Sequence, residues 1–111
     1  MQKDRPNGEK TDWNLEELID KSQQIANSKG FKVDWDNAPT YLMLIVSELS
    51  EAMEQWRDDH KEGFREEMAD VFIRLFHLVG DLGLKEDMVK SILDKLRYNE
   101  TRPYKHGRAK L

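Results

Sequence analysis

The segment PTYLMLIVSELSEAMEQW, residues 39–56, combines a strong helical pattern with the first of two acidic pairs in the chain. On a helix that turns by about 100° per residue, its apolar side chains cover a continuous arc roughly 200° wide. Glu48 falls inside this arc and Glu51 falls at its edge. A carboxylate among apolar neighbours is unfavourable unless it is paired or binds a metal ion. The segment therefore predicts a helix that buries a functional acid.

The segment FREEMADVFIRLFHLVGDL, residues 64–82, has a similarly wide apolar arc and the second acidic pair, Glu67 and Asp70. In both pairs the i, i+3 spacing places the two carboxylates on neighbouring positions of one helix face. Two such helices side by side would gather four carboxylates. Their mutual repulsion calls for a hard divalent cation, for which Mg²⁺ is the first choice. We therefore expect four Mg²⁺ ligands, which are Glu48, Glu51, Glu67 and Asp70.

Two more helices flank these segments. One runs from about Asn14 to Ser28, with Asn14 as its N-cap and Gly30 as its stop. The other runs from about Lys85 to Thr101, because Pro103 keeps the residue before it out of helical geometry. Since the loops are short and no strand pattern competes, we expect an all-α chain with a compact four-helix, bundle-like fold. The wide apolar arcs also predict that the helices pack into an oligomer.

The composition is that of an amphipathic helical protein with one domain. We expect a polar N-terminal arm over residues 1–13 and a single helical domain over residues 14–111, which ends in a basic tail. The absence of cysteine excludes disulfides and thiol chemistry. The net charge of −4 argues against binding to nucleic acid polymers. Because no segment has the pattern of a signal peptide or a membrane span, we expect a soluble, cytoplasmic protein without a membrane partner.

A group of polar residues on the last helix follows an i, i+4, i+7 pattern, and its members are Lys95, Asn99 and Arg102. Together they offer a point charge, a neutral donor and a bidentate fork, which suit phosphate oxygens. The alternative is an ordinary solvated helix end, where the helix dipole favours cations. The pattern alone leaves both interpretations open.

The order of these motifs resembles the MazG-like nucleotide pyrophosphohydrolases of the all-α NTP pyrophosphatase superfamily. The matching stretches are ELSE at 48–51, EMADVFIR at 67–74 and KLRYNETRPYKHG at 95–107. The similarity covers about residues 14–107, and the C-terminal signature makes the combination more specific than the acidic motif alone. Many relatives carry an additional Glu where this chain has Ser47, a difference that leaves the four acidic positions intact.

The resemblance implies a compact MazG fold and the Mg²⁺-dependent hydrolysis of a nucleoside triphosphate, or its deoxy form, to the monophosphate and pyrophosphate. It also implies a homo-oligomer, either a dimer or a tetramer, and a role in clearing unwanted nucleotides. Carried over position by position, the Mg²⁺ ligands match Glu48, Glu51, Glu67 and Asp70. The nucleotide-contacting positions match Lys95, Asn99 and Arg102, of which the first and last would hold the β- and γ-phosphates.

Within this hypothesis, Glu48 and Glu51 are the catalytic candidates. We expect in-line attack of water on the α-phosphorus, with Glu48 as general base because its apolar surroundings favour proton uptake. Trp35, in the loop between the first two helices, is expected either to stack on the nucleobase or to plug the end of the bundle together with Phe31. His77 shares the polar strip of its helix, where a solvated position is expected.

Two other interpretations stay open. In a chain rich in acids, such pairs also arise by chance on solvated faces, and the protein would then be a non-enzymatic helical interaction module. A buried Glu48 argues against that possibility, because such a module has no use for it. The second alternative is a related enzyme that cleaves another phosphoanhydride, such as phosphoribosyl-ATP.

Overall fold

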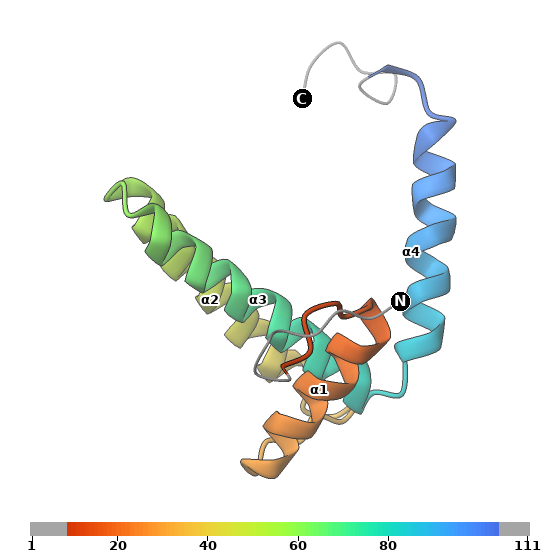
Figure 1. Cartoon of the computed structure of the whole chain (residues 1–111), viewed down its shortest axis with the longest axis horizontal. Helices are drawn as coiled ribbons and strands as arrows, with labels where there is room; N and C mark the ends of the chain where they lie inside the picture. Colours follow the sequence, from red (N-terminus) through yellow and green to blue (C-terminus); the bar gives the residue numbers. More distant parts are fainter. Residues whose placement is uncertain (1–8, 105–111) are drawn as a thin grey trace.

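The computed structural model describes residues 9–104, and this part of the chain consists of four α-helices without a β-strand (Figure 1). The predicted all-α class is thereby confirmed. Parts of the expected N-terminal arm and basic tail, residues 1–8 and 105–111, lie outside the described residues. The helices are α1 (Leu15–Ser28), α2 (Ala38–Arg57), α3 (Lys61–Asp81) and α4 (Lys85–Glu100).

The helix ends form where local chemistry favours them. Asn14 Oδ1 accepts a hydrogen bond from the N–H of Glu17 at 2.8 Å, and Glu17 Oε1 accepts one from the N–H of Asn14 at 3.0 Å. This reciprocal capping box starts α1. Gly30 and Gly83 follow α1 and α3 with φ of 90° and 73°, a left-handed geometry that favours glycine at a helix end.

The third helix begins at Lys61 rather than at Phe64 as the sequence predicted. Gly63 lies within its first turn. A Cβ on Gly63 would press against the side chain of Gln55 on α2, a flexible group that can move aside.

Helix α3 is the centre of the fold. It packs against α2 on one side and α1 on another, whereas the backbones of α1 and α2 are not adjacent (Figure 1). The buried apolar side chains are Ile19, Val33, Ala38, Ile45, Ala52, Val71 and Val79. Burial of these side chains supplies the main driving force for this arrangement.

Helix α4 diverges from the other three. It touches α1 and α3, makes no contact with α2 and contains no buried residue. Lys85 at its start bonds to Asp20 of α1 at 2.9 Å, while the rest of the helix projects away (Figure 1). The four-helix, bundle-like arrangement is therefore formed only in part within one chain. No helix among the described residues is long and apolar enough to cross a membrane.

Asp81 joins α1, the α1–α2 loop and the end of α3. Its side chain is fully buried, with 0% exposure. Oδ1 accepts hydrogen bonds from Gln23 Nε2 and Asn27 Nδ2, both at 3.0 Å, and Oδ2 accepts the N–H of Val33 at 2.7 Å. His77 Nε2 lies 2.8 Å from the same Oδ2. Burial opposes the charge, but these partners outweigh it and hold the pKa of Asp81 below its ordinary value.

Replacing Asp81 with alanine should lower the free energy of unfolding by about 3 kcal/mol, because three hydrogen-bond donors, among them the N–H of buried Val33, would lose their acceptor. Asp20→Ala is the matched control. It removes an exposed partner of Lys85 and should change stability by less than about 1 kcal/mol. Denaturant unfolding measures both effects, and equal losses would contradict this role of Asp81. Because the folded pKa is lowered, the stabilisation is present above pH 3.8 and is lost as the pH falls through the folded pKa.

Candidate metal centre

The two acidic pairs meet where α2 packs against α3. Glu48 on α2 and Glu67 and Asp70 on α3 each place one carboxylate oxygen within 4.8 Å of the others. We call these three residues the carboxylate cluster. Glu48 is only 14% exposed, as its position in the apolar arc predicted. The geometry brings three of the four predicted ligands together, while their role in metal binding stays a prediction.

Glu51 is not a member of this cluster, but its carboxyl group interacts with that of Glu67. The pKa of Glu67 is raised from 4.5 to about 7, first by the carboxyl of Glu51, with which a protonated Glu67 shares a hydrogen bond. Partial burial and the nearby carboxyl of Glu48 raise this pKa further. Negative charges forced together in this way favour uptake of a proton or a metal ion.

One oxygen of the cluster has no partner. Glu67 Oε2 is shielded from solvent and accepts no hydrogen bond from any residue in the range 9–104. A shielded carboxylate oxygen without a donor is unfavourable, and a bound cation would remove that deficit. Oxygen donors on two rigid helices fit a hard cation such as Mg²⁺ better than a soft one. The residues present therefore fit the ion that the sequence suggested.

Arg74 is the part of the site that the sequence analysis missed. Its Nε donates a hydrogen bond to Glu48 Oε1 at 3.1 Å, and its side chain is 41% exposed. The spacing from Asp70 and Glu67, i+4 and i+7, contained a signal, because it places the three side chains on one face of α3. The pairing with Glu48 crosses between helices, and the sequence pattern of α3 alone does not specify it.

A cavity of about 420 Å³ adjoins the carboxylate cluster. Asp70 and Arg74 belong to its lining, together with the apolar side chains of Phe31, Tyr41 and Ile73. The cavity therefore joins an aromatic, apolar surface to charged groups. This combination is typical of sites for small ligands that have one apolar and one charged end.

His77 forms another part of the cavity wall and is buried, so the prediction of a solvated His77 was wrong. Asp81 lies against one ring nitrogen, and Tyr41 contacts the ring edge-on with centroids 5.8 Å apart. The helical pattern places His77 on a polar strip but does not reveal that the end of this strip, at His77 and Asp81, is buried against α1 and the following loop. His77 thus holds the wall of the cavity in place.

The predicted phosphate-binding group lies on α4, away from the carboxylate cluster. Its members Lys95, Asn99 and Arg102 are all exposed. Because α4 makes no contact with α2 and extends away from the α2–α3 pair, one chain does not bring this group to the cluster (Figure 1). Their role in substrate binding stays a prediction.

The loop residues near the cavity have different surroundings. Phe31 lines the cavity, whereas Trp35 is 69% exposed and is not part of the lining. The loop residue that fills the end of the helical core is Val33, which is almost completely buried. The alternative in which Trp35 and Phe31 plug this end was therefore wrong, and the stacking role of Trp35 stays a prediction.

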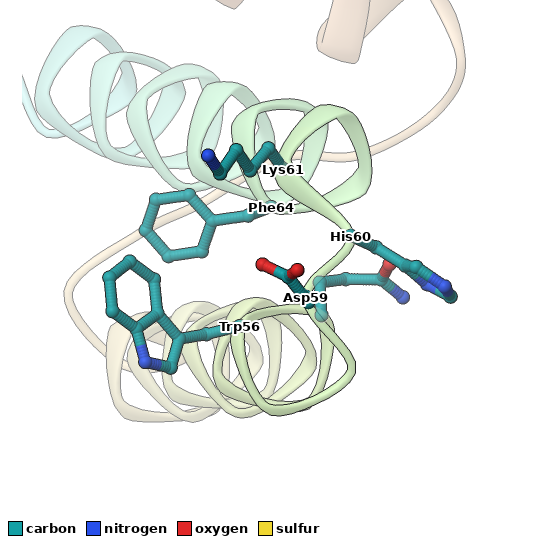
Figure 2. A pocket seen from close by; sticks show the side chains of 6 residues that line it. Trp56, Asp59, His60, Lys61 and Phe64 are labelled. Atoms are coloured by element: carbon teal, nitrogen blue, oxygen red, sulfur yellow. The ribbon is translucent and has the colours of Figure 1, made fainter.

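A second cavity, of about 240 Å³, lies at the turn between α2 and α3 (Figure 2). Figure 2 shows the rings of Trp56 and Phe64 side by side, with centroids 5.6 Å apart. Asp59 and Lys61 lie at its rim, and no residue of the two acidic pairs lines it. This cavity is separate from the candidate metal centre and belongs to an exposed apolar surface.

Comparisons of the chain with protein-family models, with characterised proteins and with solved structures find no match.

Because a proton and Mg²⁺ compete for Glu67, the rise in Tm produced by Mg²⁺ should be larger at pH 8 than at pH 6. Without metal, folded Glu67 retains a proton between pH 4.5 and about 7 that the unfolded chain releases. Its contribution to stability is therefore lost as the pH rises through this window. Thermal unfolding with and without Mg²⁺ at both pH values measures these effects.

Glu67→Gln is the control for this prediction. It should reduce the Mg²⁺-induced rise in Tm and remove its dependence on pH, since glutamine does not titrate. A wild-type response to Mg²⁺ that is equal at pH 6 and pH 8 would show that Glu67 is not the competing group.

Proposed function

We propose that the protein is a Mg²⁺-dependent pyrophosphohydrolase that converts a nucleoside triphosphate, or its deoxy form, and water to the monophosphate and pyrophosphate. The observation that carries this proposal is the convergence of Glu48, Glu67 and Asp70 around a shielded oxygen without a partner. The resemblance of the motif order to MazG-like enzymes supports the same reaction. Removal of unwanted nucleotides is the biological role that fits this activity.

The chemistry follows from the properties of the cluster. When bound, Mg²⁺ would supply positive charge that offsets the negative charge developing on the leaving pyrophosphate. Glu48, Glu51, Glu67 and Asp70 would hold the ion. Glu48 would also accept the proton of the attacking water, because its side chain is only 14% exposed. Packing of α2 on α3 fixes these groups before substrate arrives, so little reorganisation is needed.

The cavity beside the cluster is suited to the nucleoside end of the substrate. A nucleotide whose phosphates lie at Asp70 can place its base against the aromatic side chains that line the cavity, Phe31 and Tyr41. Stacking on aromatic rings tolerates different bases, which suits a broad substrate range. Trp35, on the same loop as Phe31, is the second candidate for this contact.

A homo-oligomer explains the large apolar surface of the single chain. Several large apolar side chains of α2 and α3 are exposed, including Leu49, Met53, Trp56 and Phe72. Helix α4 exposes a second apolar stripe, formed by Ile92, Leu93 and Leu96. Contiguous surfaces of this kind mark interaction sites. Association of copies would cover them, and α4 of a second copy would bring Lys95, Asn99 and Arg102 to the carboxylate cluster.

The same exposed surface also favours a second candidate function, a helical interaction module without catalysis. The two candidates differ in their response to ligands, because a module would have no specific affinity for Mg²⁺ and nucleotides. A related activity on phosphoribosyl-ATP would use the same cluster and differ only in the substrate.

A panel of nucleoside triphosphates, together with phosphoribosyl-ATP, tests the proposal directly. We expect monophosphate and pyrophosphate in equal amounts with Mg²⁺ and no products with EDTA. Glu48→Gln should lower turnover by about 100-fold or more, the range for loss of a general base, while nucleotide binding survives. Glu86→Gln makes the same change at an exposed position of α4 and should leave turnover unchanged. No hydrolysis of any substrate and no change in Tm with Mg²⁺ and a non-hydrolysable nucleotide would favour the interaction module.

Two alanine variants identify the side chain on which the nucleobase stacks. If the nucleoside enters the cavity, Phe31→Ala should raise KM about tenfold, since stacking on one aromatic ring contributes about 1–3 kcal/mol. Trp35→Ala should then change KM by less than about twofold, because this side chain lies outside the cavity lining. Steady-state kinetics with one substrate measure both. The opposite order of effects would assign the stacking contact to Trp35.

A further inference from the structure

Arg74 is the cation attached to the carboxylate cluster. Its Nε lies 3.1 Å from Glu48 Oε1, in a hydrogen bond between α3 and α2. Among residues 9–104, no other cation forms an ion pair with a member of the two acidic pairs. One guanidinium therefore faces a group of acids whose crowding is already sufficient to raise the pKa of Glu67.

The pairing uses only a small part of the hydrogen-bonding capacity of Arg74. A guanidinium has five N–H donors in a planar fork, and only the Nε–H is bonded to Glu48. Within the described part of the chain, its terminal nitrogens make no hydrogen bond. Arg74 also belongs to the lining of the 420 Å³ cavity, together with Asp70. Arg74 thus contacts the carboxylate cluster and also lines the cavity in which we place the nucleotide.

A divalent cation and Arg74 would compete for Glu48. Mg²⁺ requires a nearly octahedral arrangement of oxygen ligands, and a carboxylate bound to it attracts a second cation less strongly. Once Glu48 binds the ion, the guanidinium loses its main attraction. Phosphate oxygens of the bound nucleotide are then the best available partner, since the planar fork of arginine matches them in a bidentate manner.

We infer that Arg74 is an exchangeable counter-ion, which neutralises Glu48 in the metal-free protein and transfers to a phosphate group when the Mg²⁺–nucleotide complex binds. This inference rests on the proposed function and adds the residue that couples the binding of Mg²⁺ to the binding of the nucleotide. In this role Arg74 positions Glu48 before binding and contacts substrate afterwards. It weakens the binding of free Mg²⁺ and strengthens the binding of nucleotide.

Opposite changes in two affinities test this role in the full chain. Arg74→Gln should bind free Mg²⁺ about two- to fivefold more tightly, the effect of removing one partly exposed ion pair, as measured by Mg²⁺ titration of Tm. At saturating Mg²⁺, the same variant should bind an α,β-methylene nucleoside triphosphate about tenfold more weakly, because a charged hydrogen bond is lost. Calorimetric titration with this analogue, which cannot be cleaved at the α–β bond, gives the second affinity.

Two further variants separate charge from geometry. Arg74→Lys retains the charge and should keep the wild-type affinity for Mg²⁺, but it lacks the fork and should still bind the nucleotide analogue more weakly. Arg65→Gln removes a positive charge from an exposed position of the same helix and should change neither affinity.

The possible failures are distinguishable. If the wild type binds Mg²⁺ but Arg74→Gln leaves this affinity unchanged, or weakens the binding of both ligands together, the inference is overturned and the proposed function stands. If the wild type does not bind Mg²⁺, both are overturned. The Tm of each metal-free variant shows whether its fold is intact. Should Arg74→Gln be unfolded, unchanged nucleotide affinity in Arg74→Lys would overturn the inference.

Discussion

The repulsion among carboxylates at the α2–α3 interface is the constraint on which the rest of the site depends. Apolar packing of the two helices brings Glu48, Glu67 and Asp70 together although their charges oppose it. Two features partly offset this repulsion. Glu48 forms an ion pair with Arg74, and the raised pKa of Glu67 favours uptake of a proton. The ion pair leaves the shielded oxygen of Glu67 without a hydrogen-bond partner among residues 9–104. A hard divalent cation would compensate the charge and satisfy this oxygen at the same time.

Contacts of α1 and the α1–α2 loop with the end of α3 stabilise the helix that carries this interface. Asp81 fastens α1 and the loop with Val33 to the end of α3, and it also fixes His77 in the wall of the cavity. The cluster, the cavity and this buried network therefore follow one another along α3. Helix α4 takes little part in the single chain, which leaves its apolar stripe and its cations available to another copy.

The features that could be predicted from the sequence are those that depend on local pattern. The bounds of α1 followed from the capping residue Asn14, from Gly30 and from apolar periodicity, and the burial of Glu48 followed from its place in the apolar arc. Contacts between distant residues could not be predicted in this way. The pairing of Arg74 with Glu48 and the burial of His77 depend on how helices and loops cover one another. The divergence of α4 likewise depends on packing, which a pattern within one helix does not determine.

A crystal structure of the protein grown with Mn²⁺, which scatters anomalously and replaces Mg²⁺ at oxygen sites, tests the central claim most directly. We expect an anomalous peak between α2 and α3, within coordination distance of Glu48, Glu67 and Asp70. Arg74 should then no longer bond to Glu48. Carboxylates that remain together without a peak, or that turn away from one another into solvent in the assembled protein, would contradict the account.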